Sequence, residues 1–139
     1  MLQKSFVMAA AWLEIIVGIA LLTVPDVLSQ LFFGAKVEGA GAIFARFAGI
    51  GIFALGLACL SSRARASHRN AVLGLFVFNF GVDILFVWVG VATAVHGVLL
   101  WPGALLHGVI AAALLPQLVR LKIITLADGG EGRAGNGPG

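Results

Sequence analysis

Five polar side chains interrupt the long apolar stretches of this 139-residue sequence, and side chains of these kinds can bind protons or ions. They comprise two carboxylates, a guanidinium, an amide and an imidazole, namely Glu14, Asp83, Arg46, Asn79 and His107. A charged group at the centre of a bilayer costs about 2.5 to 3.5 kcal/mol on insertion scales, so such groups usually face the protein interior and pair. We therefore predict that these five side chains converge in one buried polar cluster.

The charges of the predicted cluster do not cancel. Two carboxylates and one guanidinium leave one negative charge, which a proton, a charged His107 or a bound cation would neutralise. This sum makes the cluster a candidate proton- or cation-binding site. A structural interpretation stays open beside it, in which Arg46 pairs with Glu14 or Asp83 and only fixes the helix register. In a further alternative, Arg46 extends to the outer headgroups.

The composition predicts the helices that carry these side chains. The chain is 60% hydrophobic and 11% charged, whereas charged residues make up about a quarter of a typical soluble domain. Its apolar residues gather in four stretches, at residues 5–24, 39–60, 71–94 and 101–119. A helix of about 20 residues is about 30 Å long and matches the hydrocarbon thickness. We predict an all-α protein, a transmembrane four-helix bundle.

A short helix is expected directly after the first span. Pro25 stops the first stretch, because proline cannot continue a helix hydrogen-bond ladder. Residues 27–33 are apolar on one side, carry Ser29 and Gln30 on the other, and end at Gly34. This pattern is typical of a helix that lies on a membrane surface, so we predict a short outer interfacial helix.

Small residues and depth both favour one cluster. Gly41, Ala45 and Gly49 form a small-xxx-small row in the second stretch, which allows two helices to approach closely. Counted at about 1.5 Å per residue, both carboxylates, the guanidinium and the imidazole fall in the outer half of the bilayer. Side chains at similar depth can meet across a bundle.

Basic residues set the expected orientation. Residues 61–70 contain three arginines, and Arg120 and Lys122 follow the fourth stretch, while the other two loops hold only Lys36 as a base. The positive-inside rule then places both termini in the cytoplasm of a multi-pass inner (cytoplasmic) membrane protein. We assign residues 1–122 to the transmembrane domain and the polar, glycine-rich residues 123–139 to a flexible cytoplasmic tail.

Other classes of function lack a sequence signal. Cys59 is the single cysteine, which excludes an intrachain disulfide and a CxxC redox pair. The three histidines lack the i,i+4 or His-x-x-Glu spacing of common metal sites, and no serine-nucleophile motif is present. The basic residues are not interleaved with aromatic ones. We predict no metal, no cofactor, no catalytic residue and no nucleic-acid partner.

Several short motifs together resemble the small four-helix bacterial membrane proteins grouped as DoxX-like. These motifs are Leu13-Glu14 with Gly18 and Pro25, Ala45-Arg46-Phe47-Ala48-Gly49-Ile50-Gly51, Ala54-Leu55-Gly56-Leu57-Ala58-Cys59, and Trp101-Pro102 with Leu106-His107. The resemblance covers residues 8–115 and implies a compact four-helix membrane fold with intramembrane Glu14, Arg46 and His107. Named relatives are associated with quinone-linked oxidation of sulfur compounds, so a quinone role enters here as an analogy.

Three hypotheses follow. The first, which we favour, is a non-enzymatic accessory subunit whose polar cluster and small-residue rows serve helix packing and partner binding. Its partners would be the lipid bilayer and either another membrane protein or further copies of this chain. The second is a proton- or cation-linked carrier in which Glu14 is the switching carboxyl. The third is a quinone- or lipid-linked enzyme that uses His107 and Asp83 as acid and base.

Overall fold

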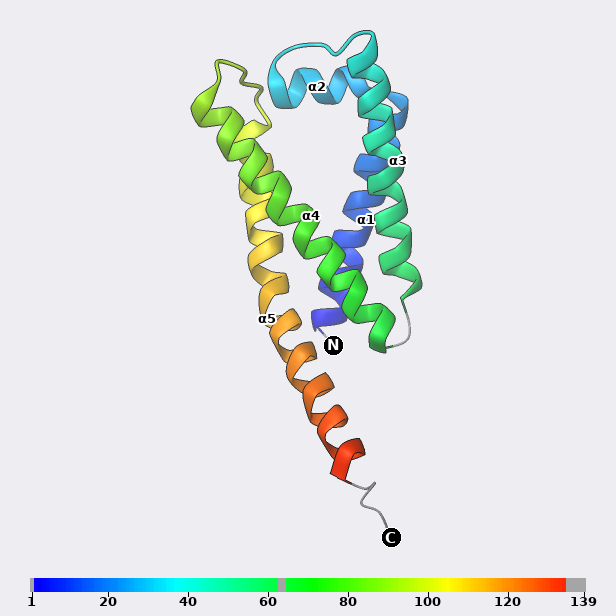
Figure 1. The fold of residues 1–139 in the computed structure, drawn as a ribbon. Helices are drawn as coiled ribbons and strands as arrows, with labels where there is room; N and C mark the ends of the chain where they lie inside the picture. The colour runs from blue at the N-terminus through cyan, green and yellow to red at the C-terminus, as the bar shows by residue number, and fades with distance from the viewer. Residues whose placement is uncertain (1, 63–64, 135–139) are drawn as a thin grey trace.

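Five α-helices and their connections make up the described part of the chain. The computed structural model describes the backbone of residues 2–62 and 65–134 and the side chains of residues 5–62 and 67–120. The helices are α1 (Leu2–Thr23), α2 (Pro25–Phe33), α3 (Ala40–Ser61), α4 (Arg65–Ala92) and α5 (Leu100–Ala134) (Figure 1). The predicted all-α class is confirmed for these residues, in which no strand occurs.

Four helices are long and apolar enough to cross a membrane. The qualifying segments are Ser5–Thr23, Ala40–Ser61, Ser67–Ala92 and Leu100–Arg120. Each coincides with one of the four apolar stretches of the sequence, because about 20 consecutive apolar residues both mark a span and favour a helix. The chain therefore has the length and composition of a four-span helical membrane protein.

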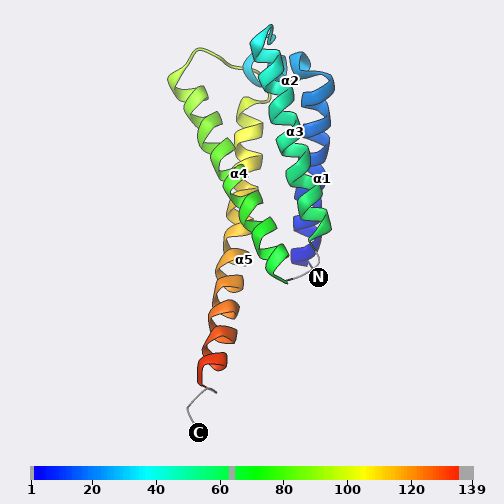
Figure 2. The same cartoon turned by 45° about the vertical axis from the view of Figure 1, so that its right-hand side comes forward.

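Two helices extend further than the apolar pattern predicts. Helix α4 already begins at Arg65, inside the expected loop, and α5 continues to Ala134, so that residues 123–134 of the expected tail are helical. Arginine and alanine, which occur in both extensions, have high helix propensity, and adding a residue to an existing helix is easier than starting one, whereas Gly129, Gly130 and Gly132 oppose the last turns of α5. Residues 135–139 lie outside the described residues. Figures 1 and 2 show α5 extending beyond the other helices.

Helix α2 lies across one end of the bundle, which we call the α2 end (Figure 1). Pro25 occupies its first turn, where a missing N–H costs nothing, and Gly34 ends it with a φ of 73°. The α4–α5 connection docks onto it, since Gly97 N–H donates to the Phe32 carbonyl at 3.0 Å and Leu99 N–H to the Leu31 carbonyl at 2.9 Å. A Cβ at position 97 would collide with the Leu31 carbonyl. The predicted short helix is thus present and anchored.

Helices α1 and α3 form the first of two pairs, and glycines line their contact. A Cβ at Gly18 would lie 2.9 Å from the Gly49 carbonyl, and one at Gly56 would lie 2.7 Å from the Ala11 carbonyl. Backbone therefore touches backbone. Gly49 of the predicted small-residue row lies in this contact, whereas a Cβ at Gly41 would meet only the Val37 side chain of its own segment. Glycine-mediated approach of this kind is common in membrane helices.

Helices α4 and α5 form the second pair, in which aromatic rings fill the space above glycines. A Cβ at Gly90 would lie 2.7 Å from the Trp101 ring, and one at Gly103 would lie 2.9 Å from the Phe86 ring. Phe32 of α2 packs on Phe86 with ring centroids 5.2 Å apart. This second pair therefore packs through side chains and is tied to α2.

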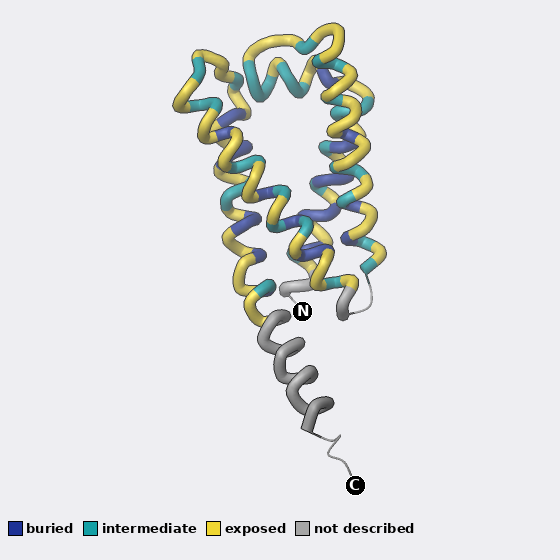
Figure 3. Tube along the Cα trace, viewed as in Figure 1, coloured by how far each residue is buried: buried dark blue, intermediate teal, exposed yellow. Residues whose placement is uncertain are grey.

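The two pairs meet in the half of the bundle away from α2. An apolar core there draws on α1, α3, α4 and α5, and it contains Val7, Ala10, Ala11, Cys59, Ala71, Val72, Leu75, Ile110 and Leu114. Figure 3 shows buried residues on the helix sides that face one another. A smaller core at the α2 end joins α4 and α5 around Phe86, Leu100 and Ala104. The bundle thus consists of two helix pairs joined along one half.

Candidate functional site

Three of the five predicted polar residues form one chain of hydrogen bonds. The Asn79 side chain of α4 donates through Nδ2 to Oε1 of Glu14 on α1 at 3.1 Å. Its Oδ1 lies 2.7 Å from Nδ1 of His107 on α5. Glu14 and Asn79 are fully buried and His107 is half-buried. These three of the five predicted residues therefore lie together and connect the two helix pairs.

The direction of this chain is set by the backbone of α4. Asn79 Nδ2 also lies 2.9 Å from the Leu75 carbonyl one turn earlier, and a carbonyl can only accept. Both Nδ2 hydrogens are then used, by Leu75 and by Glu14. Because Asn79 Oδ1 can only accept, the His107 ring must carry a hydrogen on Nδ1 and donate it. Asn79 thereby fixes the tautomer of the imidazole.

Aromatic edges hold the His107 ring on two sides. Its centroid lies 6.0 Å from the Phe78 ring and 5.9 Å from the Phe86 ring, at interplanar angles of 78° and 83°. No fully buried side-chain nitrogen or oxygen of the described residues lacks a partner. His107 Nε2 has no hydrogen bond to the described residues, so this atom must be accessible. The imidazole is therefore fixed at one nitrogen and open at the other.

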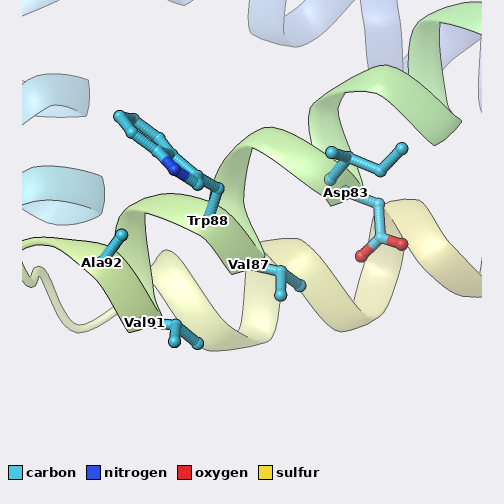
Figure 4. Close-up of a pocket in the computed structure, with 6 residues that line it drawn as sticks. Asp83, Val87, Trp88, Val91 and Ala92 are labelled. Atoms are coloured by element: carbon cyan, nitrogen blue, oxygen red, sulfur yellow. The ribbon is translucent and has the colours of Figure 1, made fainter.

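Asp83 lies one turn beyond Asn79 but outside the chain. Its carboxylate sits above Gly108 of α5, where a Cβ would approach it to 3.3 Å. It is half-buried and accepts no hydrogen bond from the described side chains. In Figure 4, Asp83, Val87 and Val91 project from one side of α4 while Trp88 projects from another. Asp83 thus borders an open, apolar face of a single helix.

Arg46 does not join the cluster either, contrary to the prediction. It is exposed on α3, and its Nη1 donates to the Ala42 carbonyl at 3.5 Å, one turn nearer the α2 end. The physical reason is the packing of α3: Gly49 and Gly56 make its close contact with α1, and it meets α4 at the opposite end, where Cys59 packs on Ala71, so Arg46 is left exposed. Similar depth therefore did not bring Arg46 to Glu14 or Asp83.

Gln117 is a further buried polar residue, which was not predicted from the sequence. Its side chain is buried and Nε2 donates to the Ala113 carbonyl at 3.5 Å. Gln117 lies three and seven residues after Leu114 and Ile110, which are both buried, so helical periodicity could have placed it on the inner face. Cys59, the single cysteine, lies in the larger core with Sγ 3.7 Å from the Ala71 carbonyl.

Within the described residues, no three His, Cys, Asp or Glu side chains gather closely enough to hold a metal ion. Comparisons with protein-family models, curated proteins and solved structures found no significant match. The assignment of a function consequently depends on the geometry of the polar residues themselves.

Proposed function

We propose that this protein is an accessory subunit of the inner (cytoplasmic) membrane that binds a protein partner within the bilayer, with both termini in the cytoplasm. One observation carries the proposal: Arg46 and Asp83, of opposite charge, lie inside candidate spans but outside the hydrogen-bond chain. Charged groups within spans usually face a protein interior or a polar partner.

Within the described residues of one copy, Arg46 and Asp83 have few hydrogen-bond partners. A guanidinium has five N–H donors, and Arg46 uses one of its nitrogens in a 3.5 Å bond to Ala42. The Asp83 carboxylate has no hydrogen-bond donor among the described residues. Polar groups of a second protein would supply what is missing, which favours a partner-binding role.

The Glu14–Asn79–His107 chain fits the structural part of the same role. Helices α1 and α4 otherwise make few contacts with each other, so this chain is a principal polar link between the helix pairs. A hydrogen-bonded polar network that specifies one packing arrangement would keep the outer faces in a fixed geometry for a partner.

Photo-crosslinking in native membranes tests the proposal. A photoreactive amino acid is placed at Ile50 on α3 or at Val87 on α4, beside the two charges, and at Ile16 on α1 as a lipid-facing control. Discrete protein adducts are expected from positions 50 and 87, and they should weaken when Arg46→Gln or Asp83→Asn is added. Lipid adducts alone at both positions would refute a partner-binding role.

A second candidate is a proton- or cation-linked carrier, favoured by one further observation. Glu14 is only 1% exposed and shares Asn79 with a histidine whose second nitrogen is accessible. A buried carboxylate in a span that can gain or lose a proton is a common element of proton-linked transport. This role predicts that Glu14→Gln abolishes proton-linked uptake in proteoliposomes while the protein stays folded, and retained uptake would dispose of it.

A further inference from the structure

We infer that the partner is a second copy of this chain, bound through an ion pair between Arg46 of one copy and Asp83 of the other. The inference rests on the proposed partner-binding function and deepens it by naming the partner. Its evidence is the complementary charge of two helix faces, α3 and α4, that the fold leaves uncovered.

The face of α3 consists of an apolar stripe with Arg46 at its edge. The stripe residues are three, four or seven residues apart, which places them on one side of a helix. All are exposed, and they are Ile43, Phe47, Ile50 and Leu57. Arg46 lies beside this stripe because it precedes Phe47 and is one turn from Ile50.

The exposed face of α4 is also an apolar stripe with a charged residue at its edge, but this charge is negative. Its exposed stripe consists of Leu73, Val77, Phe80, Ile84, Val87 and Val91. Asp83 lies one turn before Val87 at the edge of this stripe, as Figure 4 shows for its outer part. An apolar seam flanked by opposite charges is how paired helices select their partner and orientation.

The two charges also lie at matching depth. Arg46 is six residues from the start of α3 and Asp83 nine residues from the end of α4, and both of these helix ends are at the α2 end. At about 1.5 Å per residue, the two Cα atoms lie about 9 Å and about 14 Å from these helix ends, measured along each helix. The difference of about 5 Å is within the reach of an extended arginine side chain, which can pair with a carboxylate through two hydrogen bonds.

The charge balance supports the same pairing. A guanidinium and a carboxylate that pair with each other leave no net charge at the contact, whereas an unpaired guanidinium would remain charged in hydrocarbon because arginine keeps its proton. Each copy supplies one of each, so two copies can satisfy both charges reciprocally, and more copies can do so around a closed ring. A second copy thus meets both needs with residues already in the sequence.

Charge exchange between two differently tagged copies tests the inference. Both copies are co-reconstituted into lipid bilayers, extracted in a mild detergent, and captured through one tag while the other is measured. Wild-type copies should capture each other. Arg46→Asp or Asp83→Arg alone should reduce self-capture by at least about tenfold, a change equivalent to 1.4 kcal/mol, because like charges then face each other.

Mixing the two variants supplies the decisive result. An Arg46→Asp copy and an Asp83→Arg copy present opposite charges at both contacts, so capture should return to within about twofold of wild type. A chain that carries both exchanges should also capture itself. Lys36→Asp, the same charge exchange at an exposed position outside the four candidate spans, is the matched control and should leave capture unchanged.

Circular dichroism and thermal unfolding show whether each variant is folded. If the charge-exchange variants do not fold, Arg46→Gln and Asp83→Asn replace them, and each should reduce self-capture. Self-capture that is absent in wild type, or unaffected by these substitutions, would overturn the inference. In that case, adducts with a different protein at positions 50 and 87 would still support the partner-binding function. Lipid adducts alone would refute both that function and the binding of a second copy.

Discussion

The two helix pairs differ in the contacts that hold their helices together. In α1/α3 the contact is backbone on backbone, with Gly18 and Gly49 opposite each other and no polar side chain between them. In α4/α5 the contact is ring on glycine, and the pair carries Asn79, Asp83 and His107. The first pair is thus joined by close backbone contact, and the second carries three of the five polar side chains.

This difference explains why most of the polar side chains lie on one helix pair. Close backbone contact between α1 and α3 leaves no room for a polar side chain in the seam, so Glu14 projects from α1 to Asn79 on α4. In α4/α5 the contacts at Gly90 and Gly103 are made by aromatic side chains, and the polar side chains lie beside these rings. Substitutions that add volume should therefore harm the first pair more than the second.

The largest effect is expected for Gly49→Leu in α3. A Cβ there would already lie 2.8 Å from the Gly18 carbonyl and 3.1 Å from the Leu22 nitrogen, and neither backbone atom can move without separating the helices. We expect a loss of about 3 kcal/mol or more in the free energy of unfolding, measured by denaturant titration in detergent micelles. Gly51→Leu is the matched control, because nothing lies within 4 Å of a Cβ at that position. Equal stability of the two variants would contradict the backbone contact.

Asn79→Leu should have the second largest effect, because it removes the centre of the polar chain. Glu14 and His107 would each lose a partner while the apolar volume stays similar. Leaving buried polar groups unpaired costs about 1 to 3 kcal/mol, and we expect about 2 kcal/mol in the same titration. Val77→Leu, on the exposed side of α4, serves as the control. A loss below about 0.6 kcal/mol, the mean for hydrogen bonds in a membrane protein, would show that the chain contributes little to holding the pairs together.

The spans and three members of the polar chain could be predicted from the sequence because each depends on a local property. Apolar runs of the right length mark helices, and the cost of polar atoms in hydrocarbon forces Glu14, Asn79 and His107 inward. The fate of Arg46 could not be predicted, since depth along a helix says nothing about which helices are neighbours. The early start of α4 at Arg65 was also missed, because polar helical turns leave no trace in hydropathy.

A smaller effect is expected for Gly90→Ala in the second pair. Its Cβ would lie 2.7 Å from the Trp101 ring, but that ring is half exposed and can tilt away. The clash should cost about 1 kcal/mol, which the higher helix propensity of alanine offsets by about the same amount. Gly81→Ala on the same helix meets nothing within 4 Å. It should be more stable than Gly90→Ala by about 1 kcal/mol. No difference between the two would indicate that Trp101 does not pack on Gly90.

The smallest effect concerns a single proton in the second pair. In a variant with His68→Gln and His96→Gln, His107 gives the only histidine signals in a nitrogen-15 NMR spectrum. We expect the neutral ring to carry its hydrogen on Nδ1, because Asn79 Oδ1 accepts from that atom at 2.7 Å while the Leu75 carbonyl fixes the amide. Adding Asn79→Leu removes the acceptor and should shift the hydrogen toward Nε2. An Nε2-protonated ring before that substitution would mean that the amide of Asn79 is reversed. The amide oxygen would then face Glu14, which could bond to it only by carrying a proton and donating it.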